Sequence, residues 1–142
     1  MADVAARPAR PLPHLAEPDT APFWRATREG RLTYQVCRRC GAVVFYPRAH
    51  CTGCGGPELE WRTSAGEGTI YTFTVIRQHG HPFFAGRVPY ALALVDLDEG
   101  FRMLTEIVGA DPEQVRVGQR VELAWEDAGE VRIPVFRPRA GD

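Results

Sequence analysis

The chain has 142 residues, which is enough for one ordinary domain or two very small ones. Its formal net charge of −1 at pH 7 argues against a protein whose main task is to coat a polyanion. All 17 basic residues are arginine. A Schiff base between a lysine and a carbonyl substrate is therefore excluded as a route to catalysis.

Neither a membrane span nor an export signal is expected. The sequence has no apolar run of about 18 residues, the length a spanning helix needs. Residues 1–10 contain Asp3 and lack the continuous apolar stretch of a signal peptide. We therefore expect a cytoplasmic, reducing setting, in which four cysteines are more often metal ligands than disulfides.

The N-terminal part predicts a tail and then a helix. Residues 1–18 carry four prolines among small residues and predict an extended, flexible tail. Residues 19–30 predict a docking helix that Thr20 is placed to cap. Phe23 and Trp24 lie at its start. Because so short a helix is unstable alone, these aromatic side chains must pack either on this chain's own body or in a groove of a partner protein.

Residues 31–64 predict a rubredoxin-like zinc ribbon. Two Cys-x-x-Cys pairs, Cys37 with Cys40 and Cys51 with Cys54, are separated by ten residues. Each such turn directs two sulfurs at one point, and an intervening hairpin brings the second pair opposite the first. Four sulfurs leave no position for an activated water, so the spacing favours a structural Zn²⁺. Iron in the same cage and a redox dithiol are the alternatives.

Residues 65–138 predict a five-stranded barrel, and residues 139–142 a short tail. A one-turn helix is expected at 111–114, between the third and fourth strands. This is the strand and helix order of an OB-fold, and a generic small β-barrel is the rival interpretation. Taken with the preceding segments, the fold class is mainly β: N-terminal helix, zinc ribbon, OB-fold. The expected strands are 69–76, 90–97, 101–108, 120–125 and 131–136.

Alternation within these strands makes two further predictions. Tyr71, Phe73 and Trp125 fall on apolar faces and are expected in the core. Pro134 lacks a backbone N–H and indicates that the last strand lies at an edge.

Catalytic motifs are sparse. The only serine, Ser64, has no nucleophile motif around it. His79 and His81 flank a glycine in the segment 79–90, where they could serve as metal ligands or acid–base groups. Without a nearby carboxylate in the sequence, loop histidines with no catalytic role are the simpler interpretation.

The same segment is rich in aromatic side chains. Phe83, Phe84 and Tyr90 surround Arg87. An apolar loop of this kind at a barrel mouth contacts a partner or a ligand tail, or it folds over the end of its own barrel. The sequence leaves both possibilities open.

At this point the pattern resembles a known family. The order helix, ribbon, barrel is similar to that of the bacterial and archaeal zinc-ribbon OB-fold proteins known as domain of unknown function 35. The resemblance covers roughly residues 20–138. It is carried by Pro22-Phe23-Trp24, Gly30-Arg31-Leu32, the Cys37/Cys40 and Cys51/Cys54 pairs, residues 66–74, Pro89-Tyr90 and Leu97-Asp98-Glu99-Gly100-Phe101-Arg102.

The resemblance implies a function. Members of the family accompany thiolase-like acyl-CoA enzymes, including lipid-transfer-type aldolases that shorten steroid side chains. Within the family, the chain resembles the C-terminal domain of steroid enoyl-CoA hydratase subunits that pair with such an aldolase. The resemblance implies that the four cysteines bind structural zinc. It also implies that the partner holds the catalytic residues and that the two chains share an acyl-CoA site.

Residues for contact with the partner or with acyl-CoA follow from this implication. Arg77 and Arg87 are candidates for a CoA phosphate, which arginine binds in a forked geometry. The remaining candidates are Phe23, Trp24, His79, His81, Phe83, Phe84 and Tyr90.

Two other functions compete with the accessory subunit. Zinc ribbons and OB barrels also bind single-stranded nucleic acid by stacking bases on aromatic side chains, although the net charge argues against it. An independent small enzyme would have to use His79 or His81.

Overall fold

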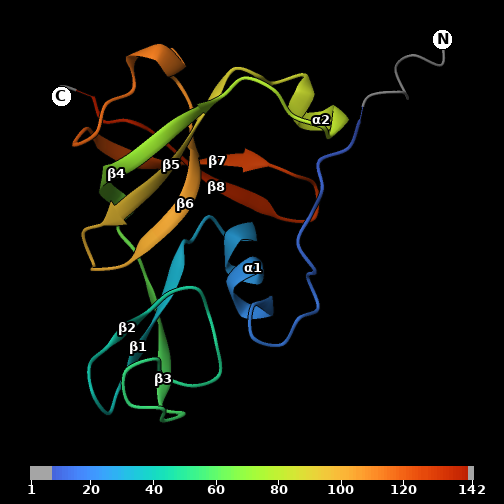
Figure 1. Cartoon of the computed structure of the whole chain (residues 1–142). Coiled ribbons are helices and arrows are strands. Elements are labelled where there is room, and N and C mark those ends of the chain that lie inside the picture. The colour runs from blue at the N-terminus through green and yellow to red at the C-terminus, as the bar shows by residue number, and fades with distance from the viewer. Residues whose placement is uncertain (1–7, 141–142) are drawn as a thin grey trace.

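The computed structural model describes residues 8–140 (Figure 1). A short helix, α1 (Ala21–Arg28), precedes a small three-stranded antiparallel sheet of β1 (Thr33–Cys37), β2 (Val43–Val44) and β3 (Leu59–Thr63), in the order β2-β1-β3. The remaining strands close into a five-stranded barrel in the order β4-β5-β6-β8-β7. Their bounds are β4 (Glu67–Ile76), β5 (Tyr90–Leu97), β6 (Arg102–Ile107), β7 (Arg120–Asp127) and β8 (Arg132–Pro138).

The predicted fold class is confirmed. The chain is mainly β, with one N-terminal helix, a zinc-ribbon region and a closed five-stranded OB-fold barrel. The expected one-turn helix is a 3₁₀ helix, Pro112–Gln114, and the Asp111 side chain accepts a hydrogen bond from the Glu113 amide at its start. A further helical turn, α2 (Pro82–Ala85), lies in the segment that was expected to be a loop.

Helix α1 is held to the body by buried side chains. Phe23 is 6% exposed and its ring lies 5.9 Å from that of Phe45. Thr27 is fully buried, and its hydroxyl accepts a hydrogen bond from the Arg132 amide at the start of β8. Thr20 occupies the N-cap position without a side-chain capping bond, so its expected capping role is wrong. Tertiary packing holds the helix in place.

The ribbon and the barrel share one core. Leu32 and Tyr34 belong to the same buried cluster as the barrel residues Phe101 and Val121. The Tyr34 ring stacks on Phe101 with 5.0 Å between centroids. Stacked aromatic side chains are thus buried across the junction between the two parts.

A bulge in β4 explains a wrong burial prediction. The pairing of β4 with β5 shifts between Ile70 and Thr72, which makes Tyr71 the extra residue. Ile70, before the bulge, faces the core, and Phe73, after the bulge, packs against the same core. Tyr71 is 51% exposed, because a bulge changes which face the following residues occupy. Phe73 and Trp125, which were also expected in the core, are partly buried and pack against it.

The edge assignment for the last strand is also wrong. Strand β8 pairs with β7 over Arg132–Pro138 and meets β6 through the single parallel bridge of Ile107 with Phe136. Pro134 lies on the weakly paired side of the barrel, where its carbonyl accepts a hydrogen bond from the buried Thr105 hydroxyl. Closing the barrel at one bridge accommodates the missing N–H of proline.

Helices long and apolar enough to cross a membrane do not occur between residues 8 and 140.

Candidate metal centre and contact surfaces

The four cysteines converge at the end of the ribbon sheet farthest from the barrel. Cys37 ends β1, and the other three lie on the two turns beside it. The Sγ atoms of Cys37 and Cys54 are 3.7 Å apart, those of Cys40 and Cys51 are 3.5 Å apart, and all four lie within 4.8 Å of one another. Gly41, which follows the first pair, has φ +80°, a conformation that glycine adopts without strain.

Backbone amides surround the sulfurs. The amide of Cys40 donates to the Sγ of Cys37, and those of Gly53 and Cys54 donate to the Sγ of Cys51. The Cys54 amide is the main cause that lowers the pKa of the Cys51 thiol to about 6. At Cys40 a hydrogen bond from the Ala42 backbone lowers the pKa, but the Cys51 thiol, burial and the other thiols together raise it to about 11. The backbone amides therefore favour the thiolate form of Cys51, and a bound cation favours ionisation of all four thiols.

The cluster fits tetrahedral Zn²⁺. Zn–S bonds of about 2.3 Å place the sulfurs of a tetrahedron about 3.8 Å apart, close to the shorter observed separations. Four thiolate donors fill the coordination shell and leave no place for a substrate or water. The residues therefore form a structural zinc site, as predicted.

The predicted helix aromatics have different environments. Phe23 belongs to the core, as expected if the helix packs on its own chain, and its 6% exposure offers a partner little surface. Trp24 is partly buried and lines an open apolar hollow of about 330 Å³ between α1, the loop after β2 and strands β6 and β8. Tyr46 and Leu104, about half exposed, border it, and the Tyr46 hydroxyl accepts a hydrogen bond from the Leu104 amide.

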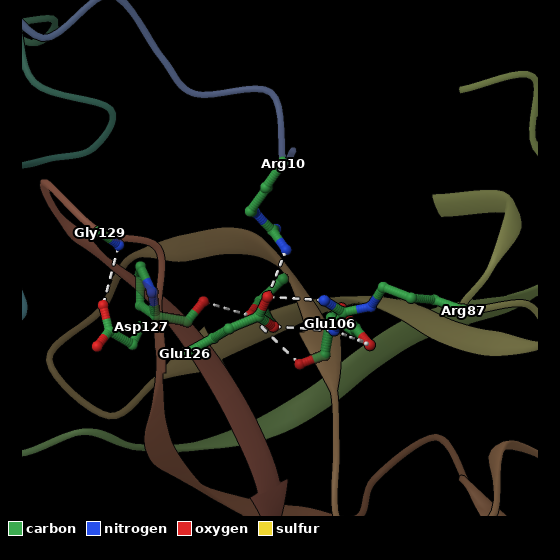
Figure 2. A network of polar contacts seen from close by, with 8 residues as sticks. Arg10, Arg87, Glu106, Glu126, Asp127 and Gly129 are labelled. Atoms are coloured by element: carbon green, nitrogen blue, oxygen red, sulfur yellow. Dashed lines mark hydrogen bonds and ion pairs between the residues drawn. The ribbon is translucent and has the colours of Figure 1, made fainter. Parts of the chain in front are cut away.

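Arg87 lies in a network of charges within the chain (Figure 2). Its guanidinium donates to both oxygens of Glu126, at 2.6 and 2.8 Å, and to Glu106 at 3.0 and 3.2 Å. Arg10 approaches Glu126 from the other side, with Nη1 to Oε2 at 2.8 Å. The network contains two arginines and two glutamates, so its formal charges balance.

Burial and ion pairing act in opposite directions on the two glutamates. Burial raises the pKa of Glu106, against the attraction of Arg87. Hydrogen bonds from Arg87 lower the pKa of Glu126, whereas burial alone would raise it. The hydrogen bond to Glu126 is also the main cause that raises the pKa of Arg87. The Arg87 guanidinium is thus bound to the carboxylates of Glu106 and Glu126. It would have to break both ion pairs to bind a phosphate.

The predicted aromatic segment packs around this network. The guanidinium of Arg10 lies 5.4 Å from the Phe83 ring centre and 5.3 Å from that of Phe84. The guanidinium of Arg87 lies 5.1 Å from Phe83. Tyr90 begins β5 with 9% exposure, and burial raises the pKa of its hydroxyl. The structure thus brings together Phe83, Phe84, Arg87 and Tyr90.

The rings of His79 and His81 lie 4.8 and 6.0 Å from that of Phe84, but neither histidine nor Arg77 bonds to the charged network. Nδ1 of His81 accepts a hydrogen bond from the Phe83 amide and caps α2, and Nδ1 of His79 accepts one from the His81 amide. Arg77 pairs with Glu113 on an exposed surface at 2.6 Å. Local capping accounts for one ring nitrogen of each histidine, and neither histidine has a carboxylate partner within residues 8–140.

Three members of the charged network were not predicted from the sequence. Arg10 falls in the stretch expected to be a flexible tail, and Glu106 and Glu126 fall on separate strands of the barrel. No local spacing connects these residues. The one available signal was Arg87 itself. It is an isolated positive charge among aromatic residues, and such a charge requires a negative partner.

The geometry above defines a zinc-ribbon OB-fold protein. Family models describe the same two parts: a ChsH2 rubredoxin-like zinc ribbon domain matches residues 24–60, and a ChsH2 C-terminal OB-fold domain matches residues 61–126. A DUF35 domain-containing scaffold protein of Methanocaldococcus jannaschii is 36% identical over 105 residues, which cover 72% of this chain and 73% of the relative. The chain belongs to the DUF35 family.

Other relatives carry names from acyl-CoA metabolism. A probable enoyl-CoA hydratase alpha subunit of Thermomonospora curvata is 36% identical over 91% of this chain and 40% of the relative. Benzoylsuccinyl-CoA thiolase subunit BbsA of Geobacter metallireducens is 31% identical over 68% of this chain and 64% of the relative. The chain thus spans about 40% of the length of the hydratase subunit.

A solved structure matches over almost its whole length. A chain of the Ltp2-ChsH2(DUF35) aldolase aligns with a TM-score of 0.80 and 35% identity, over 91% of this chain and 98% of the solved one. The helix, ribbon and barrel therefore have counterparts in a chain of that assembly.

Proposed function

We propose that this chain is a non-catalytic accessory subunit, which binds a thiolase-like acyl-CoA enzyme and helps to form its acyl-CoA site. The observation that carries this proposal is the match to a chain of the Ltp2-ChsH2(DUF35) aldolase over 98% of that chain's length. The scaffold protein and the thiolase subunit among its relatives support the same role. In its finer form, the partner is a thiolase or a lipid-transfer-type retro-aldolase of steroid side-chain degradation in the cytoplasm.

The chemistry of the described residues supports an accessory role. The metal centre is closed by four sulfurs, and a closed centre is a scaffold for folding. The partly buried charges of Arg87, Glu106 and Glu126 satisfy one another. Such a network holds these side chains to one another, so they are not available as catalytic groups without breaking the ion pairs.

Co-expression with neighbouring genes tests the proposal. We expect a complex with a thiolase-like chain, identified by mass analysis of the purified material. Cleavage of an acyl-CoA thioester substrate should require the partner and should be absent with the isolated chain. Turnover by the isolated chain, or the absence of any thiolase-like partner, would refute the proposal.

A single-stranded nucleic-acid module is the second candidate. Tyr71 is half exposed on the barrel, as a stacking platform would be, although the Arg102 guanidinium lies 3.5 Å from its ring centre. Filter binding with single-stranded DNA at low salt separates the two functions. Tight binding that falls steeply with added salt would favour this candidate.

A further inference from the structure

Strand β3 lies at an edge of the ribbon sheet, which extends away from the barrel (Figure 1). Each barrel strand has a neighbour on both sides, and the other edge strand of the ribbon, β2, has only two residues. Among the described strands, β3 alone therefore presents a five-residue side without a neighbour. The N–H and C=O groups on such a side can pair with another strand.

The ladder with β1 determines which backbone groups of β3 point outward. Just before β3, the Glu58 carbonyl accepts a hydrogen bond from the Arg38 amide. Just after β3, the Ser64 amide donates one to the Leu32 carbonyl. In an antiparallel pair such bonds recur at every second residue. The even-numbered residues of β3 thus bond to β1, and the backbone groups of the odd-numbered residues, Trp61 among them, point away from it.

The side chains of β3 are complementary to those of a second β3. Glu60 and Arg62 lie on one face of the strand and Trp61 on the other. When two copies pair antiparallel with Trp61 opposite its counterpart, Glu60 of each chain faces Arg62 of the other. A shift by two residues in either direction, which again pairs the outward groups, places two glutamates or two arginines opposite each other. Facing opposite charges stabilise a strand pair and like charges destabilise it, so charge selects one register.

The ion pair within each chain leaves an acceptor for this contact. Nε and Nη2 of Arg62 both donate to Oε1 of Glu60, at 3.1 and 2.7 Å. Oε2 of Glu60 accepts no hydrogen bond within residues 8–140, so it can accept one from a second arginine. The side chains of Arg62 and Glu60 are 54% and 37% exposed, and Trp61 is 37% exposed. All three are therefore accessible to another chain.

We propose that the chain forms a two-fold symmetric dimer through β3, in which two ribbon sheets join edge to edge into one continuous sheet. The same residues contact each other from both sides, as in most dimers of soluble proteins. Outward backbone groups of Trp61 form the central pair of hydrogen bonds, with the two indoles opposite each other. The two pairs of Glu60 with Arg62 flank this centre. The inference goes beyond the proposed function and does not depend on it.

Charge reversal tests the dimer in the full-length, zinc-loaded chain. Sedimentation equilibrium at increasing chain concentration should show a reversible equilibrium between monomer and dimer. Glu60→Arg and Arg62→Glu each replace two attractive pairs with two repulsive ones, so each should raise the dissociation constant of the dimer about tenfold. An equimolar mixture of the two variants has opposite charges at both contacts. It should therefore dimerise about as well as the unaltered chain.

Glu122→Arg and Arg137→Glu are the matched controls. This ion pair joins β7 and β8 at 2.9 Å, and its side chains are 33% and 56% exposed, close to the values for the β3 pair. Both controls should leave the dissociation constant unchanged. Hydrogen exchange gives a second measurement, because the outward Trp61 amide should become protected as the chain concentration rises. In Glu60→Arg it should stay unprotected at the same concentrations.

The outcomes decide between this dimer and other uses of the edge. A monomer at every concentration would overturn the inference. A dimer that Glu60→Arg and Arg62→Glu leave intact would overturn it as well, because it would form through another surface. So would loss of binding to a thiolase-like chain in these variants while the unaltered chain is monomeric, since β3 would then pair with that partner. Recovery in the mixed sample supports the dimer. Zinc content and melting temperature of each variant exclude unfolding as the cause.

Discussion

At the scale of single residues, the charges of the barrel are arranged in pairs. The Arg87 side chain is 27% exposed, that of Glu106 12% and that of Glu126 22%, so all three are partly removed from water. Ion pairs in such surroundings are weak evidence for stability by themselves, because desolvation offsets their attraction. Removing one partner is costly nevertheless, since it leaves the opposite charges unpaired.

Arg87→Ala should therefore destabilise the fold by about 2–4 kcal/mol. The loss arises because two partly buried glutamates are left close together, and Arg10 is then their one ion-pair partner among residues 8–140. Urea unfolding followed by circular dichroism measures the change.

Arg77→Ala is the control for this prediction. The side chains of Arg77 and Glu113 are 60% and 52% exposed. Removing this ion pair should therefore lower the free energy of unfolding by less than about 1 kcal/mol. If the two substitutions cost the same, the charged network of Arg87 does not stabilise the barrel.

At the scale of elements, the ribbon depends on its metal. Its outer end has a small buried cluster, in which Cys37 and Cys51 accompany Val44 and two partly buried side chains. So few apolar contacts cannot offset the entropy of ordering the two cysteine turns. The barrel has a larger core, with Val95, Val121 and Phe136 almost completely buried.

Loss of zinc should accordingly disorder the cysteine turns and leave the barrel strands folded. Cys54→Ser removes one zinc ligand. We expect the zinc content to fall well below one ion per chain. Atomic absorption gives the metal content, and limited proteolysis followed by mass analysis locates cleavage within residues 38–57.

Thr52→Ser, an exposed change in the same turn, should retain the metal and resist the protease. Full metal content in Cys54→Ser would contradict a four-sulfur centre.

At the scale of the whole molecule, a small polar contact adds to the shared core where the ribbon meets the barrel. Glu99, in the turn between β5 and β6, accepts hydrogen bonds from the Ser64 hydroxyl and the Ala65 amide, both at 2.7 Å. The Ser64 hydroxyl in turn accepts one from the Gly66 amide. Gly66 has φ +77°, and a Cβ there would lie 2.7 Å from the Cβ of Leu123, so the chain turns here against the barrel wall.

Glu99→Ala should loosen this junction and cost about 1–3 kcal/mol, because a nearly buried hydroxyl and an amide lose their acceptor. Hydrogen exchange of the Ala65 amide should become faster, while exchange in β5 should stay slow. Glu130→Ala is the control, because it removes an exposed carboxylate that forms no ion pair within the part of the chain that the structure describes. Unchanged exchange at Ala65 would show that aromatic packing alone fixes the junction.

Local pattern determined a large part of this protein. The cysteine spacing was sufficient to predict the zinc centre, because each Cys-x-x-Cys turn is built from adjacent residues. Alternation and turn residues located the five barrel strands and the 3₁₀ helix for the same reason. The order of these elements identified the family.

Only the tertiary structure decided what depends on distant residues. The bulge that exposes Tyr71, the closure of the barrel around Pro134 and the burial of Phe23 all follow from pairing and packing across the chain. The sequence identified Arg87 as a candidate contact residue. Its ion-pair partners Glu106 and Glu126 come from β6 and β7 and became apparent only in the folded chain. Side-chain contacts between strands have no period along the sequence, and for this physical reason they appear only once the chain is folded.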